Sequence, residues 1–113
     1  MCGFAGEVAF GGIDAEVVRP RLARALDRLY LRGPDSQESW FDDRCALANA
    51  RLSVQDLSSA ASLPMSARRL TVAYNGEIYN FRELRAELEA AGHGFTTTGD
   101  TEILLAGWRQ WGE

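Results

Sequence analysis

Cys2 is the first residue of the chain that could do chemistry. Methionine aminopeptidase generally removes Met1 when the following side chain is small, and cysteine qualifies. The exposed N-terminal cysteine would carry a thiol nucleophile and an α-amine whose pKa of about 7.7–8 suits a base at neutral pH. Such a pair needs no histidine, and His93, the single histidine of the chain, lies between two glycines in a predicted loop. A cysteine at position 2 also occurs by chance, so this residue alone does not establish catalysis.

Asn75 and Gly76 are candidate hydrogen-bond donors to a developing negative charge. A side-chain amide and a neighbouring backbone N–H can hold an oxyanion together. Asn-Gly is also a frequent dipeptide of hairpin turns, and the local sequence favours that explanation. Gly3 and Gly6 likewise could let the backbone approach a ligand closely, or could belong to an ordinary strand.

Arg51 and Asp100 have the charges needed to bind an α-amino acid. Arg51 lies in an otherwise uncharged stretch, where its planar guanidinium could grip a carboxylate or extend into solvent from a half-exposed strand. Asp100 could bind an ammonium group or cap the helix that follows it. The two residues together would recognise both charged groups of an amino acid.

Hydrophobic periodicity and the positions of Gly and Pro divide the chain into strands and helices. The order indicates an α/β (α+β) chain with several strands joined as hairpins, in which three helices need more sheet to cover than these strands offer. We therefore expect a truncated domain. The predicted elements are strands at 3–10, 39–41, 45–54, 70–74 and 95–97, helices from about Pro20 to before Arg32, at 81–91 with Asn80 as cap and at 100–112 with Asp100 as cap, and a surface loop at 56–69.

The composition excludes several classes of function. A net charge of −4 and a single adjacent basic pair, Arg68-Arg69, argue against a nucleic-acid surface. No apolar run approaches the roughly 18 residues that span a membrane, and no basic segment of a secretory signal precedes residue 10, so a cytoplasmic protein is expected. A metal or redox site of Cys2, Cys45 and His93 has no ligand-like spacing, and we expect no metal.

The motifs, taken in order, resemble the class II glutamine amidotransferases, whose catalytic domain belongs to the N-terminal nucleophile hydrolases. Each motif is weak by itself, but their order and spacing together are specific. The Arg-Gly-Pro-Asp and Asn-Gly-Glu-Ile-Tyr-Asn motifs are most similar to those of asparagine synthetases. The resemblance rests on Met1 to Gly6, Arg32 to Asp35, Arg51 to Leu57, Tyr74 to Phe81 and Thr98 to Glu102.

This resemblance implies a fold and a set of site residues. The fold would be a four-layer αββα sandwich, of which residues 1–113 form an incomplete glutaminase domain without the synthetase domain. Cys2 would attack the side-chain amide of glutamine, while Asn75 and Gly76 hold the oxyanion. The implied substrate-binding residues are Arg51 for the α-carboxylate, Asp100 for the α-ammonium, and Leu52, Val54 and Glu77.

The resemblance also implies partners. Glutamine would be the substrate, and ammonia would pass to a synthetase domain or missing C-terminal half that uses ATP and Mg²⁺ to amidate aspartate. This chain itself would need no cofactor, and a homodimer is a further possible assembly. The alternative is a non-catalytic remnant or interaction module of such an enzyme. The chain departs from the family at Leu31 and Asn49, where histidine is usual, and at Glu38, where glycine is common.

Overall fold

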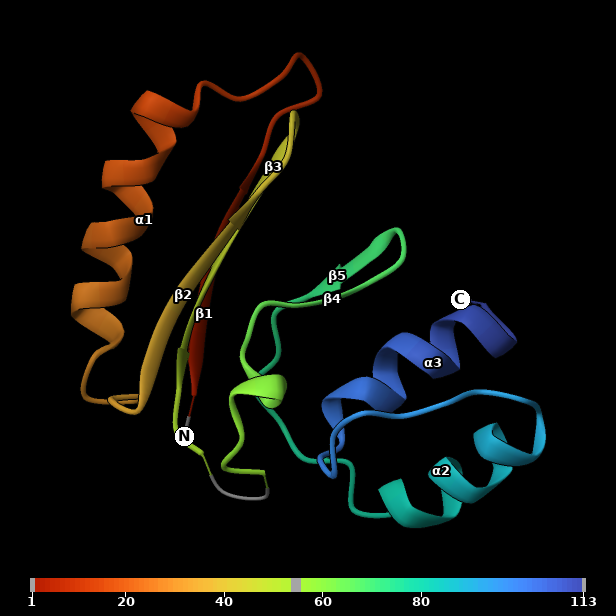
Figure 1. The fold of residues 1–113 in the computed structure, drawn as a ribbon. Coiled ribbons are helices and arrows are strands. Elements are labelled where there is room, and N and C mark those ends of the chain that lie inside the picture. The colour runs from red at the N-terminus through yellow and green to blue at the C-terminus, as the bar shows by residue number, and fades with distance from the viewer. Residues whose placement is uncertain (1, 54–55, 113) are drawn as a thin grey trace.

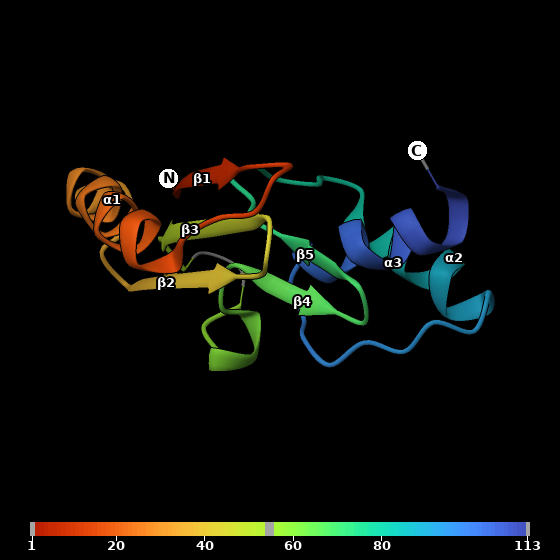
Figure 2. The same cartoon turned by 90° about the horizontal axis from the view of Figure 1, so that it is seen from above.

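A computed structural model describes residues 2–53 and 56–112 as an α/β chain with antiparallel sheets and helices on two sides (Figures 1 and 2). The coarse prediction of fold class is therefore confirmed. In chain order the elements are β1 (Gly3–Val8), α1 (Ala15–Leu29), β2 (Ser36–Phe41), β3 (Cys45–Arg51), a 3₁₀ turn (Ser59–Ala61), β4 (Met65–Ala67), β5 (Leu70–Val72), α2 (Phe81–Ala90) and α3 (Thr101–Trp111).

The larger sheet is antiparallel, with β3 between β1 and β2. Its register pairs Gly3 with Ala50 and Ser36 with Arg51, so the start of β1 and the start of β2 both lie beside the end of β3. α1 packs on one face of this sheet, because small side chains alternate along β3 and let the helix approach closely. The buried contact consists of Val18, Leu22 and Leu26 from α1 and Ala46, Ala48 and Ala50 from β3.

The predicted start of the first helix near Pro20 is wrong. α1 begins five residues earlier, because Asp14 caps it by accepting a hydrogen bond from the backbone N–H of Glu16 at 3.0 Å. Pro20 lies inside the helix, where it removes one backbone donor. The amphipathic pattern from Val18 to Leu29 nevertheless holds the helix together by burial against the sheet.

The loop between α1 and β2 packs tightly against the end of β3. A Cβ atom at Gly33 would overlap the carbonyl group of Ala50, so only glycine fits there. The backbone N–H of Asp35 donates to the carbonyl oxygen of Arg51 at 3.0 Å, and the Asp35 carboxylate accepts from the Ser53 N–H at 2.7 Å. The Arg-Gly-Pro-Asp motif thus fixes the point at which β3 ends.

The second part of the structure joins β4, β5, α2 and α3, and Figure 1 shows it on the side of the large sheet away from α1. β4 and β5 form an antiparallel hairpin. Leu105 of α3 packs with Leu63 and Met65 in one buried cluster. Leu88 of α2 packs with Ile103 and Ala106 of α3 in another.

Two further predictions about the elements are wrong. Residues 56–69 are not a polar surface loop, because they include β4 and bury Ala61, Leu63 and Met65. Residues 95–97 form no strand, because the Glu102 carboxylate binds their backbone N–H groups instead of a neighbouring strand. The buried side chains of the first segment, Ala61, Leu63 and Met65, alternate along the chain, which is the strand-type pattern that the composition of their small and polar neighbours obscures.

The predicted helix caps are correct in position and wrong in chemistry. Asn80 and Asp100 stand at the N-cap positions of α2 and α3, but neither side chain makes a capping hydrogen bond. α2 ends before Gly92, whose φ of 94° is the left-handed conformation that glycine adopts readily after a helix. The Asp100 carboxylate is therefore available for a different contact.

Candidate active site

A pocket of about 370 Å³ lies where four parts of the chain meet: Cys2 before β1, the end of β3 with the segment that follows it, the segment after β5, and the loop before α3. Residues far apart in the sequence contribute, since Cys2 and Thr101, the first residue of α3, line the same pocket. Val54 lies outside the described residues. The other predicted site residues all line the pocket: Cys2, Arg51, Leu52, Asn75, Gly76, Glu77 and Asp100.

Cys2 is placed by the pairing of β1 with β3. Because Gly3 lies opposite Ala50, the preceding residue comes beside the chain that leaves β3. Its Sγ accepts a hydrogen bond from the Leu52 backbone N–H at 3.3 Å and lies 3.5 Å from the Leu52 carbonyl oxygen. Arg32 donates through Nε to the Cys2 carbonyl oxygen at 3.3 Å. The thiol is thus held on the pocket wall by the backbone of Leu52.

Arg51 is buried, with 8% of its surface exposed, so the interpretation as a solvent-facing strand residue is wrong. It is the last residue of β3. Its Nη2 donates to the carbonyl oxygen of Asp56, and its Nη1 donates to that of Ser58 at 3.4 Å. These neutral carbonyls orient the guanidinium without neutralising its charge, so the pocket wall carries a positive group.

Asn75 and Gly76 follow β5 in extended chain, and the hairpin-turn interpretation is wrong. The tight turns that favour Asn-Gly need a positive φ at the glycine, and Gly76 has none. A Cβ atom at Gly76 would lie 2.8 Å from the Tyr74 hydroxyl oxygen, so a larger residue here would require the Tyr74 side chain to shift. The backbone N–H of Tyr74 donates to Oδ1 of the fully buried Asn49 at 3.3 Å, which ties this segment to β3.

Asp100 is also buried, and its carboxylate accepts a hydrogen bond from the Ile78 backbone N–H at 2.8 Å. This contact joins the loop before α3 to the segment that carries Asn75 and Gly76. Burial, followed by the negative charges of Asp100 and Glu77, raises the pKa of Tyr74 above its ordinary value. The Tyr74 phenol is therefore uncharged across the physiological range.

Sequence reasoning missed several residues that line the pocket: Asp56, Ala61, Leu63, Tyr74, Tyr79, Gly99 and Thr101. Asp56 makes the most polar contacts of this group. The pattern Asp56-Leu57-Ser58 could have revealed it, because an Asp followed two residues later by Ser is typical of a turn closed by the Asp side chain. The Ser58 N–H indeed donates to Oδ1 of Asp56 at 2.8 Å.

The structure does not bring together Cys2 and Cys45, two of the three residues of the metal or redox hypothesis. Cys45 begins β3, opposite Val8, whereas Cys2 lies beside the other end of that strand. The His93 ring is hydrogen-bonded to Gln110 of α3 at 2.9 Å. Burial and the neighbouring Asp42 carboxylate raise the pKa of the Cys45 thiol, which disfavours its thiolate form.

No helix of the described residues has both the length and the apolar character required to cross a membrane.

Several known proteins are similar to this chain in sequence. The model of a family described as glutamine amidotransferase domain matches residues 1–113. Asparagine synthetase [glutamine-hydrolyzing] 3 and 1 of Bacillus subtilis (strain 168) are each 37% identical to it, over 119 and 116 residues. An asparagine synthetase [glutamine-hydrolyzing] of Triphysaria versicolor is 34% identical over 114 residues. All three alignments cover 100% of this chain but only 18–19% of the relative, so the chain spans about a fifth of their length.

Proposed function

The chain belongs to the glutamine amidotransferase domain family, and we propose on that basis that it hydrolyses the side-chain amide of glutamine to glutamate and ammonia. The observation that carries this proposal is the pocket itself, which gathers a thiol, a carboxylate, a guanidinium and an Asn-Gly pair from distant parts of the chain. These are the groups that acyl transfer from an amino-acid amide requires.

The proposed nucleophile is the Cys2 thiol, with the α-amine freed by removal of Met1 as its base. The sulfur attacks the amide carbon while the amine takes the thiol proton. That proton then passes to the departing nitrogen, so that ammonia leaves and a thioester remains. Water attacks the thioester, its proton returns through the same amine, and glutamate is released with the thiol restored. Each tetrahedral intermediate carries an oxyanion that the Asn75 amide and the Gly76 N–H would stabilise.

The proposed substrate clamp uses opposite charges on two sides of the pocket. Arg51 would bind the α-carboxylate and Asp100 the α-ammonium group. Both are buried, which strengthens a charged hydrogen bond relative to one in water. Leu52, Val54 and Glu77 complete the proposed set of substrate-binding residues, Leu52 through the segment that also contacts the Cys2 thiol.

The proposal extends to the larger protein that such a domain serves. Ammonia would pass to an ATP- and Mg²⁺-dependent synthetase domain that converts aspartate to asparagine in the cytoplasm. Residues 1–113 would be one part of a four-layer αββα glutaminase domain. The packing of α1 on the larger sheet and of α3 beside β4 and β5 supports this arrangement. A homodimer is also compatible with the proposed role.

A glutamine-analogue electrophile tests the proposal directly. We expect mass spectrometry to find the label on Cys2 and not on Cys45, in a protein whose mass shows that Met1 is absent. Excess glutamine should protect Cys2, and the variant Cys2→Ala should not be labelled. A folded protein whose Cys2 is never labelled would instead be a non-catalytic remnant. An active preparation that retains Met1 would exclude the amine as the base.

A further inference from the structure

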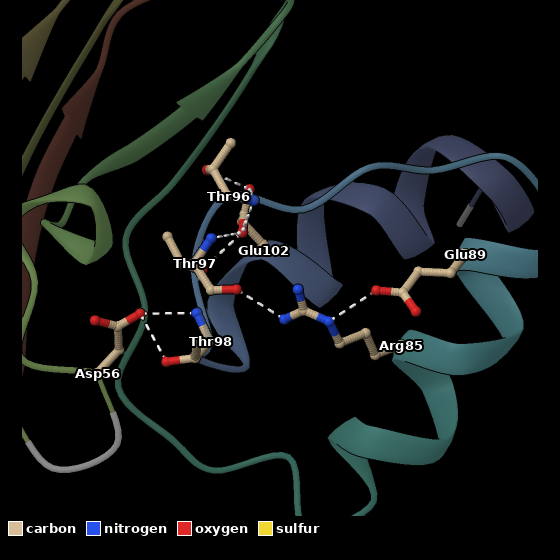
Figure 3. Close-up of polar contacts among 7 residues, drawn as sticks. All are labelled: Asp56, Arg85, Glu89, Thr96, Thr97, Thr98 and Glu102. Atoms are coloured by element: carbon tan, nitrogen blue, oxygen red, sulfur yellow. Dashed lines mark hydrogen bonds and ion pairs between the residues drawn. The ribbon is translucent and has the colours of Figure 1, made fainter.

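Asp56 connects two loops that are distant in sequence. Its Oδ2 accepts hydrogen bonds from the backbone N–H of Thr98 at 2.8 Å and from the Thr98 hydroxyl at 3.1 Å, across 42 positions of chain (Figure 3). Its Oδ1 accepts from the backbone N–H of Ser58 at 2.8 Å. The carboxylate is buried, so these three donors replace the water that would otherwise solvate it.

The backbone of the same residue holds Arg51. The Asp56 carbonyl oxygen accepts from Nη2 of the guanidinium, and the carbonyl oxygen of Ser58 accepts from Nη1. The residue therefore contacts Arg51 through its main chain and Thr98 through its side chain. A displacement of Asp56 would move the support of Arg51 and the anchor of the loop at the same time.

The connection continues to Asp100 and beyond it. Thr98 precedes Asp100 by two residues, and the Asp100 carboxylate accepts from the Ile78 N–H at 2.8 Å. Three segments of the pocket wall are thus linked in a series that runs from Arg51 through Asp56 and Thr98 to Asp100 and then to Ile78. Among the hydrogen bonds of the described residues, Asp56 is the only member of that series that bonds both to Arg51 at the end of β3 and to Thr98 in the loop before α3.

We propose that Asp56 is a positioning residue that sets the separation between Arg51 and Asp100, and thereby makes the pocket selective for the paired carboxylate and ammonium groups of an α-amino acid. This inference rests on the proposed glutamine hydrolysis. Asp56 acts through the two loops and not on the reacting amide, because its oxygens are already bound by protein donors. Its loss should therefore weaken glutamine binding more than it slows the chemical step.

The charge of Asp56 matters to this role. Hydrogen bonds from the Ser58 side chain and the Thr98 backbone hold the pKa of its carboxyl below the usual range, so it is ionised at neutral pH. An ionised carboxylate accepts at both oxygens, which the donors from Ser58 and Thr98 require. Asparagine at this position would present an NH₂ group to one of them and lose that contact.

Glu102 provides a matched control. Its carboxylate binds the same kinds of donor, the backbone N–H groups and hydroxyls of Thr96 and Thr97, at 2.7–3.2 Å (Figure 3). These partners are only five or six residues away in sequence, and Glu102 does not line the pocket. Both carboxylates hold the same loop, but only Asp56 connects it to Arg51.

The test compares Asp56→Asn with Glu102→Gln in glutamine hydrolysis and in thermal unfolding. We expect Asp56→Asn to raise KM for glutamine by about tenfold, the effect of weakening a charged hydrogen bond, with kcat changed by less than about threefold. The two substitutions should lower Tm by similar amounts, but Glu102→Gln should leave KM for glutamine unchanged. Alkylation of Cys2 by iodoacetamide, which has no amino-acid group, should proceed at the same rate in both variants.

Two results would overturn the inference while leaving the proposed function intact. One is an equal rise in KM in the two variants, which would make Asp56 a general support of the loop. The other is a fall in kcat at unchanged KM. If Asp56→Asn does not fold, Thr98→Val removes only the hydroxyl donor, and it should raise KM in the same direction by a smaller factor; an unchanged KM would overturn the inference. A wild-type protein that folds but does not hydrolyse glutamine would overturn both.

Discussion

The sheet side of the pocket, which carries Cys2 and Arg51, is built differently from the loop side, which carries Asn75 and Asp100. On the sheet side the functional residues stand at the ends of paired strands, and their positions follow from the register of β1, β3 and β2. On the loop side no strand ladder reaches the functional residues. Single carboxylates bind the backbone there instead, Asp100 at Ile78 and Glu102 at Thr96 and Thr97.

This difference predicts how each side responds to substitution. A strand is placed by many backbone hydrogen bonds, so the loss of one side chain removes its chemistry and leaves its neighbours where they were. A loop placed by one carboxylate moves when that carboxylate is changed. Substitutions on the sheet side should therefore give clean losses of one function, whereas those on the loop side should also disturb the local structure, whether or not the substituted residue lines the pocket.

The largest effect is expected for Cys2→Ala, which should abolish glutamine hydrolysis because it removes the nucleophile. The register of β1 and β3 should survive, since it does not depend on the thiol. Cys45→Ala, at the other end of β3, is the control and should keep nearly full activity. Steady-state assays of both variants, with circular dichroism to check folding, measure this. Substantial activity in Cys2→Ala would require a different nucleophile.

The next largest effect belongs to the segment after β5. Asn75→Ala should lower kcat by about 10²–10³-fold, the cost of losing one oxyanion donor, because the charge that it stabilises exists only near the transition state. Cys2 alkylation by iodoacetamide should be unaffected, which would separate the oxyanion role from a collapse of the pocket. A rise in KM alone would identify Asn75 as a substrate-binding residue.

Substitutions of Arg51 should change glutamine hydrolysis by an intermediate amount. Arg51→Ala should reduce kcat/KM for glutamine by about 10–150-fold, the loss of a charged hydrogen bond worth roughly 1.5–3 kcal/mol. Arg51→Lys should recover only part of this, because an ammonium group cannot replace the planar guanidinium between the Asp56 and Ser58 carbonyls. Full recovery with lysine would show that charge alone is needed at this position.

The smallest effect is a difference in acid sensitivity between the two sides. Burial by itself raises the pKa of Glu102, but hydrogen bonds from Thr97 and Thr96 more than offset it, so the net pKa is lowered. A lowered pKa stabilises the folded state above the unfolded value of about 4.3, and this contribution is lost as pH falls through the folded value. Hydrogen-exchange protection at Thr96 and Thr97, whose N–H groups Glu102 binds, should fall below about pH 4 before protection along β3 does.

Glu102→Gln is the control for this experiment, because it removes the titrating group. Its protection at Thr96 and Thr97 should be lower at neutral pH and should change less on acidification. Equal loss of protection in β3 and in the loop would show that acid unfolds the chain as a whole. The proposed difference between the two sides would then not apply to their stability.

The sheet side was largely predictable from the sequence, and the loop side was not. The helical spacing after Val18 and the strands expected at 3–10, 39–41 and 45–54 indicated the elements of the sheet side, although the helix begins earlier than expected because Asp14 is a stronger start signal than Pro20. The resemblance to the amidotransferase family identified residues that do converge on the pocket. Their roles in glutamine binding and hydrolysis remain predictions.

The loop side depends on contacts that no local pattern reveals. Asp100 was expected to cap α3, yet its carboxylate binds Ile78, 22 positions earlier. Asp56 was placed in a surface loop because its neighbours are small and polar, yet it is buried against Thr98. Local sequence can indicate that a carboxylate will bind backbone N–H groups, but the choice of partner is set by how the rest of the chain folds.

The long sequence separation of these contacts has a consequence for how the protein is made. During translation Cys2 is synthesised 50 residues before Leu52, whose N–H binds its sulfur. The loop that completes the pocket is synthesised later still, since it ends at Asp100. Nascent chains grow at about 5–20 residues per second, so several seconds pass between the synthesis of Cys2 and the synthesis of the loop that completes its pocket. On the proposed mechanism, the aminopeptidase that removes Met1 can therefore act on an open chain end, and maturation of the nucleophile precedes assembly of the site that uses it.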